Sequence, residues 1–136
     1  LPVSKSNATE NDVLKANLKG TDPAWRSNAN RYLALYTADP GEAGTATTSE
    51  IAYTNYARVA VPVADWVDGG SDFSNTNLLQ FPVCGVTGAV ATHVAIVTTS
   101  AGAGQILYSG ALDASLTISN LIQPQFAAGA LHVQED

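Results

Sequence analysis

The stretch that decides the fold reads Thr92-His93-Val94-Ala95-Ile96-Val97-Thr98-Thr99, Gln105-Ile106-Leu107-Tyr108-Ser109-Gly110, Ser115-Leu116-Thr117-Ile118-Ser119 and Phe126-Ala127-Ala128-Gly129-Ala130-Leu131-His132-Val133. Its short β-branched and aliphatic runs are separated by Gly, Asn and Pro, which is typical of strands joined by turns. Asp113 is the only formally charged residue between Thr92 and Val133. A segment with so little charge must bury much of its surface, either in a core or against a partner.

The first half of the chain adds further strand patterns. The run Arg31-Tyr32-Leu33-Ala34-Leu35-Tyr36-Thr37 carries apolar or amphipathic side chains on both faces, which favours a strand covered on both sides. Residues 57–62 predict a strand that ends at Pro62 or lies at a sheet edge, and two short runs follow near Phe73 and at 78–82. With the second half, this gives about seven or eight strands. We therefore expect an all-β fold, a jelly-roll or antiparallel sandwich, with one short N-terminal helix.

The helix is predicted over about residues 8–19. Asn7, followed three positions later by Glu10, forms a capping-box pattern, and Gly20 supplies a C-terminal stop. Apolar side chains recur near helical spacing at Val13, Leu14 and Leu18. Because an isolated helix of this length is marginal, this apolar stripe must be covered, either by the protein's own core or by a neighbouring subunit.

The length of 136 residues indicates a single domain. We divide it into an N-terminal arm and helix at 1–20 and a β-sandwich at 31–133. The composition is 46% apolar and 13% charged, against about 25% charged in ordinary soluble domains, so uncharged polar side chains must cover much of the surface. No run of about 18 apolar residues is present, and the sequence predicts no membrane span.

Charge is distributed unevenly along the chain. All six Lys and Arg residues lie at or before Arg58, and the net charge of −6 belongs to the residues that follow. Nucleic acids and anionic membranes are recognised through basic surfaces, so neither is an expected partner. Arg58 itself stands in an otherwise apolar strand. It either faces outward or pairs with a carboxylate within the chain, or else forms an ion pair with another subunit.

The polar residues do not assemble into a recognisable catalytic or metal-binding pattern. Three aspartates surround a Gly pair, but without the spacing of an EF-hand, so a solvated turn is favoured: Asp65, Asp68 and Asp72. The two imidazoles and the single thiol are too few for a zinc site unless an acid joins them: His93, His132 and Cys84. The sequence also lacks Gly-x-Ser-x-Gly and a complete phosphate-binding Gly pattern. We expect no catalytic residue, no metal and no cofactor, and hence no enzyme.

Aromatic side chains leave two interpretations open. Such rings usually pack in a core or on a sheet, but their faces also stack on sugars, which would suit a receptor-binding protein. The set comprises Trp25, Tyr32, Tyr36, Tyr53, Tyr56 and Trp66.

Several stretches together resemble a known family. They are Asn11-Asp12-Val13-Leu14-Lys15, Leu35-Tyr36-Thr37-Ala38-Asp39-Pro40-Gly41-Glu42-Ala43-Gly44, Tyr56-Ala57-Arg58-Val59-Ala60-Val61, Leu107-Tyr108-Ser109-Gly110-Ala111-Leu112 and the final run from Phe126 to Asp136. Over nearly its whole length the chain resembles small tailed-bacteriophage virion proteins, often labelled tail-fibre proteins. It is also similar to the cement proteins that decorate the heads of short-tailed phages, such as that of a Bordetella phage.

This resemblance implies an all-β, jelly-roll-like and usually oligomeric module that needs no cofactor. It implies a place on the outer surface of the capsid in the virion, where such a protein clamps neighbouring copies of the major capsid protein. The low charge of the chain suits permanent contacts, because charged residues are depleted at interface cores. The alternative is a tail-fibre or tail-tip module that binds a host receptor or glycan.

We also expect a homodimer and an anchoring role for the N-terminal segment. The uncharged strands at 92–99 and 105–109 lack the Lys residues that usually protect sheet edges, so edge pairing or exchange of a terminal segment would cover them. Basic side chains on the helix can meet acidic groups of a neighbouring copy or of the capsid. The candidate interface residues are Val13, Leu14, Leu18, Lys15, Lys19 and Arg58.

Overall fold

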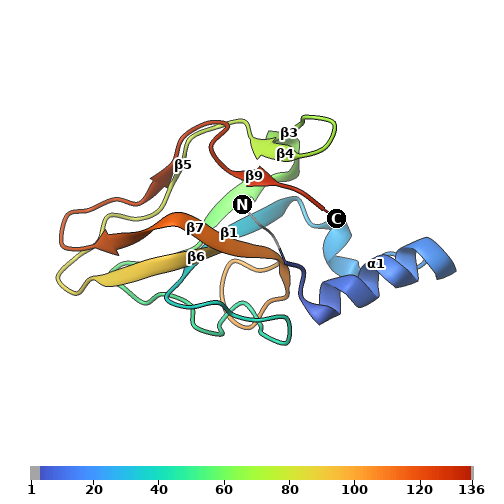
Figure 1. The fold of residues 1–136 in the computed structure, drawn as a ribbon, viewed down its shortest axis with the longest axis horizontal. Helices are drawn as coiled ribbons and strands as arrows, with labels where there is room; N and C mark the ends of the chain where they lie inside the picture. Colours follow the sequence, from blue (N-terminus) through green and yellow to red (C-terminus); the bar gives the residue numbers. More distant parts are fainter. Residues whose placement is uncertain (1–3, 136) are drawn as a thin grey trace.

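The computed structural model of the chain describes residues 4–135, and the first three residues of the expected N-terminal arm lie outside this range. The largest element is a four-stranded antiparallel sheet (Figure 1). In spatial order it contains β2 (Val59–Pro62), β1 (Asn30–Tyr36), β6 (Ala89–Val97) and β7 (Ile106–Ile118). These strands come from the β-branched and aliphatic runs of the sequence, as predicted.

Two smaller antiparallel sheets complete the fold. One contains β3 (Trp66–Asp68), β4 (Phe73–Asn75) and β9 (His132–Val133), and the other pairs β5 (Leu79–Gln80) with β8 (Gln125–Phe126). Of two short 3₁₀ helices, η1 (Ala24–Ser27) lies between the N-terminal helix and β1, and η2 (Val63–Asp65) connects β2 to β3. The expected all-β fold with one N-terminal helix is confirmed, and of the two expected architectures the antiparallel sandwich is the one observed.

The main core lies between the large sheet and the two small ones. Leu33 and Val94 from the large sheet pack into one buried cluster with Leu79, Phe81 and Leu131 from the opposing layer. Tyr36 lies on the other face of β1, in a second cluster closed by Ala46, whose carbonyl oxygen accepts the tyrosine hydroxyl at 2.8 Å. The strand at 31–37 is therefore covered on both faces, as its sequence predicted.

The order of the strands shows which of the expected sheet edges exist. Residues 92–99 fall largely in β6, which is paired on one side with β1 and on the other with β7, so that stretch is not an exposed edge. The outer strands are β2 and β7, and the backbone of β7 pairs with Ser4 at Ser109. The pairing of β6 with β7 shifts between His93↔Ala111 and Ala91↔Leu116, and Asp113 lies in this irregular segment. A bulge and a charged side chain are common protections of an edge strand.

Helix α1 (Asn7–Lys19) begins one residue earlier than expected. Its N-cap is Ser6, whose side chain accepts the Thr9 N–H, and it ends at Gly20, which adopts the left-handed conformation at φ 64°. The helix extends away from the sheets (Figure 1). Within residues 4–135, the structure contains no helix long and apolar enough to cross a membrane.

Candidate functional site

Hydrogen bonds from polar groups in its first turn hold helix α1 against the sandwich. The hydroxyl groups of Ser6 and Thr9 both donate to the carbonyl oxygen of Ile106, at 2.6 and 2.7 Å. The amide of Gln105 donates in turn to the Thr9 hydroxyl at 2.9 Å. Ser6 and Thr9 are almost fully buried, and buried hydrogen bonds of this kind fix an orientation that an apolar contact leaves adjustable. The start of α1 is therefore held at one place on β7.

Asp12, one turn further along, links the helix to η1. Its Oδ2 accepts hydrogen bonds from the Trp25 indole N–H and from the Gln105 amide, both at 2.9 Å. The bond from Trp25, followed by that from Gln105, lowers the pKa of Asp12 below its ordinary value of 3.8, and this effect exceeds the opposing influence of desolvation. The ionised carboxylate is thus the form that ties the helix, η1 and the start of β7 together.

The contribution of ionised Asp12 to stability should be measurable as the pH is lowered. Because the folded-state pKa of Asp12 is lowered, its stabilising contribution is present in full above about pH 4 and is lost as the pH falls through the lowered value. The Asp12→Asn variant is therefore expected to have a lower melting temperature than wild type at pH 7. The difference between the two melting temperatures should narrow below about pH 4. Circular dichroism melts across this range measure it, with Glu10→Gln on the exposed side of α1 as the control. A difference that stays constant down to about pH 2 would contradict the assignment.

The apolar stripe of α1 is not covered by the protein's own core. Leu14 is 57% exposed and Leu18 is 79% exposed, and Val13 is only partly buried. Of the two covers expected for this stripe, the protein's own core is not the one observed, because the polar contacts at the first turn hold only one end of the helix against the sheet. Lys15 and Lys19 are exposed beside the leucines, and the ion pairs found within residues 4–135 do not include either lysine.

Arg58, the remaining candidate interface residue, is engaged within the chain. Its guanidinium forms a bidentate pair with Glu50, at 2.7 and 2.8 Å, and donates to the carbonyl oxygens of Thr99 and Gly102 at 2.9 and 2.7 Å. The arginine side chain is only 3% exposed. The carboxylate-paired interpretation therefore holds, and the inter-subunit ion pair expected as its alternative is replaced by an intrachain one.

Glu50 also joins this network to the core. The Tyr56 hydroxyl donates to Glu50 Oε2 at 2.7 Å and accepts the Leu35 N–H at 3.2 Å. Burial, followed by the hydrogen bond to Glu50, raises the pKa of Tyr56, and the hydrogen bond that Arg58 donates to Glu50 raises the pKa of Arg58. Both groups therefore keep their protons, and the cluster joins β1 to the loop after β6.

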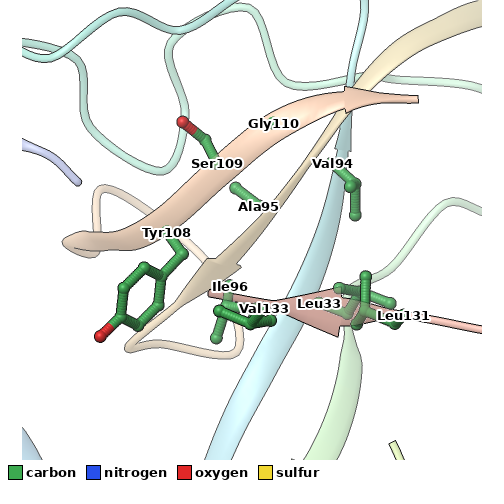
Figure 2. A pocket seen from close by; sticks show the side chains of 9 residues that line it. All are labelled: Leu33, Val94, Ala95, Ile96, Tyr108, Ser109, Gly110, Leu131 and Val133. Carbon is green, nitrogen blue, oxygen red and sulfur yellow. The ribbon is translucent and has the colours of Figure 1, made fainter. Parts of the chain in front are cut away.

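Two hollows of different character lie near the sheets. Figure 2 shows the smaller, in which Ile96, Val133, Leu33 and Leu131 gather while the Ser109 hydroxyl points away. Its volume is about 10 Å³, which is about the space of one water molecule. It is too small to hold a ligand larger than a water molecule.

The larger hollow is an open groove of about 580 Å³. Trp25 and Trp66 both line it, together with Phe73 and Tyr108. Its charged lining residues are Arg26, Arg31, Asp72 and Glu135. The two tryptophans are far apart in sequence, and only the fold brings them into one surface.

The four tyrosines of the aromatic set differ from the two tryptophans in their surroundings. Tyr36 and Tyr53 are buried, Tyr32 packs against the cluster around Tyr36, and the Tyr56 ring lies edge-on to Tyr53. Core packing is therefore the role of these four tyrosines. The sugar-stacking interpretation remains applicable to Trp25 and Trp66.

Four of the residues considered for metal binding have other partners. Asp68 accepts the Gly70 N–H at 2.8 Å in a turn, and Asp72 pairs with His132 at 2.6 Å. The His93 ring bonds the Thr92 hydroxyl at 2.8 Å, and Cys84 is buried. Residues 4–135 contain no group of three or more His, Cys, Asp or Glu side chains placed to hold a metal ion.

Comparison with known families adds a second line of information. Residues 4–134 match the family described as podophage GP4 fiber I protein gp80. The chain belongs to this family. The expected kinship with tailed-phage virion proteins is thereby confirmed, and it gives the chain a structural role in the virion. A search of curated proteins finds no match.

The sequence of this gp80-family protein predicts the N-terminal helix but not all of the residues that hold it. Ser6 and Thr9 form a recognisable N-cap spacing, so a local signal for them existed. Gln105 has no such signal, because it lies 96 residues from Thr9. Arg31 and the pairing of Trp25 with Trp66 in one groove were likewise visible only once the strands were placed.

Proposed function

We propose that this protein cements the phage capsid by sitting on the outer surface of the shell and bridging neighbouring major capsid proteins. One observation carries this proposal: α1 projects from the sandwich with Leu14 and Leu18 uncovered. Full burial of a leucine side chain contributes about 1.5–3 kcal/mol. A helix that is fixed at one end and apolar along its exposed side is suited to insert between capsid subunits.

The charges on the helix would set its orientation. Lys15 and Lys19 flank the leucines, whereas the chain beyond Arg58 has acids and no Lys or Arg. An acidic patch on the capsid, or the acidic part of a neighbouring copy, complements the helix. Exposed ion pairs contribute only about 0–1 kcal/mol each, so the leucines supply the affinity and the lysines the direction of approach.

Self-association is part of the same proposal. Beyond Ser109 the outer edge of β7 has no paired strand within residues 4–135, and its parts on either side of the protected segment around Asp113 bear no charge. A homodimer would cover that edge and place two copies of α1 on one particle, so that each dimer reaches more than one capsid subunit. The proposed activity is purely mechanical and involves no catalysis, metal or cofactor.

A second candidate function is supported by the groove. Trp25 and Trp66 present aromatic surface beside charged groups, which suits a fibre or tail-tip module that binds a host receptor. The word fiber in the family description agrees with this alternative. We rank it second because the projecting leucines would then have no role.

The number of copies per virion separates the two functions. A cement protein must occupy many equivalent positions on the shell, so we expect hundreds of copies per particle, in fixed ratio to the major capsid protein. Quantitative mass spectrometry of purified virions, calibrated against the portal protein, measures this ratio. A handful of copies would rule out cementing and favour the tail module.

A further inference from the structure

The groove contains an arginine with unusual surroundings. Arg31 points its guanidinium at backbone carbonyl oxygens, those of Asn28 at 3.0 Å and of Asn30 and Arg26 at 3.3 Å. The other two arginines of the chain each pair with a carboxylate, but Arg31 has no carboxylate partner within residues 4–135. It is partly buried, and desolvation lowers its pKa. A positive charge held in this way favours an anionic group from outside the chain.

The aromatic wall next to Arg31 is held in a fixed position. The Arg31 guanidinium lies 5.2 Å from the centre of the Trp25 ring, and Asp12 fixes the same indole through its N–H. Trp66 contributes a second indole from β3, and both rings are partly buried, so each leaves surface exposed to the groove. Rigid aromatic surfaces bind ligands at a low cost in conformational entropy.

The acids of the groove already have hydrogen-bonding partners. Glu135 accepts from Lys5 at 2.6 Å and from the Tyr108 hydroxyl at 2.8 Å, and Asp72 pairs with His132. Their remaining lone pairs can accept hydroxyl groups. The two acids and two arginines that line the groove also give it a balanced charge, which disfavours polyanions such as nucleotides and tolerates one negative charge.

These features together describe a small ligand with a ring that stacks, hydroxyl groups and a single anionic group. The volume of about 580 Å³ lies within the range of about 300–1,000 Å³ that is typical of small-molecule sites. We propose that the groove binds a carboxylated sugar, with the carboxylate on Arg31 and the sugar ring against the tryptophans. This site goes beyond capsid cementing, and the sugar binding itself does not depend on where in the virion the protein lies.

A matched pair of ligands tests the proposal on the unaltered protein. Methyl glucuronide and methyl glucoside differ only in the carboxylate, and two-dimensional NMR of the full chain reports both the affinity and the residues that respond. We expect the glucuronide to shift the indole signals of Trp25 and Trp66 and to bind at least about tenfold more tightly than the glucoside. Equal affinities, or shifts elsewhere on the surface, would overturn the proposal.

Variants of Arg31 test whether this residue supplies the positive charge that binds the sugar carboxylate. Arg31→Gln is expected to reduce glucuronide affinity to that of the glucoside, and Arg31→Lys to retain part of it, because lysine keeps the charge but not the planar fork. Lys19→Gln, which removes a positive charge far along α1, serves as the control and should bind like wild type. Undiminished binding by a folded Arg31→Gln would contradict the assignment. Binding of N-acetylglutamate amide in preference to the glucuronide would also overturn it, in favour of an acidic protein partner.

Discussion

Replacing Arg58 with alanine is expected to lower the free energy of unfolding by about 3 kcal/mol. The change removes every donor that the arginine supplies to Glu50, Thr99 and Gly102, and the Glu50 side chain, only 14% exposed in the intact protein, loses its charged partner. Breaking a buried ion pair costs about 3–5 kcal/mol because one charge is left behind. The lower end applies here, since the Tyr56 hydroxyl still bonds Glu50. Urea denaturation followed by circular dichroism gives the difference directly.

The chain contains a matched control for this experiment. Arg26 pairs with Asp22 at 2.6 Å, but their side chains are 48% and 67% exposed. Arg26→Ala is therefore expected to change stability by about 1 kcal/mol or less. If the two variants lose the same free energy of unfolding, burial of the Arg58–Glu50 pair contributes nothing to stability, contrary to the role assigned to it.

The second large effect concerns capsid binding. The double substitution Leu14→Ser and Leu18→Ser is expected to weaken binding to emptied capsids by roughly 100- to 10,000-fold. Each leucine contributes only if the partner buries it, and both are exposed in the isolated protein. Stability should therefore remain close to wild type. Co-sedimentation with emptied capsids measures the binding, and a thermal melt checks the fold.

Leu121 provides the comparison at another site. It is 78% exposed and lies in the connection between β7 and β8, so Leu121→Ser removes the same surface without altering α1. We expect this variant to bind capsids as wild type does. If Leu121→Ser and the double variant lose affinity alike, the helix is not the specific anchor. Deletion of residues 1–20 is a poorer test, because it would also remove the Ser6 and Thr9 contacts with β7.

Local pattern predicted the elements well, since β-branched runs and an N-cap followed by Gly20 are local signals. It did not predict which strand lies at the edge, because the position of β6 depends on pairing with residues of β1 and β7. The stripe on α1 was expected to mark a docked face, yet the docking is polar. The Arg58 network was not predicted either, because it joins distant parts of the chain. Glu50 is 8 residues from Arg58, but Thr99 is 41 residues away. Contacts between such distant residues leave no periodicity in the sequence.

The attachment of α1 to the Ile106 carbonyl also sets an order of events during synthesis. The helix leaves the ribosome early, but its acceptor lies 97 residues after Thr9. At about 5–20 residues per second, the acceptor follows roughly 5–20 s later. An unattached helix of this length is only marginally formed in that interval. The leucines of α1 are thus presented on a fixed helix only after the last long strand is made, and under the proposed function capsid binding would wait until the domain is complete.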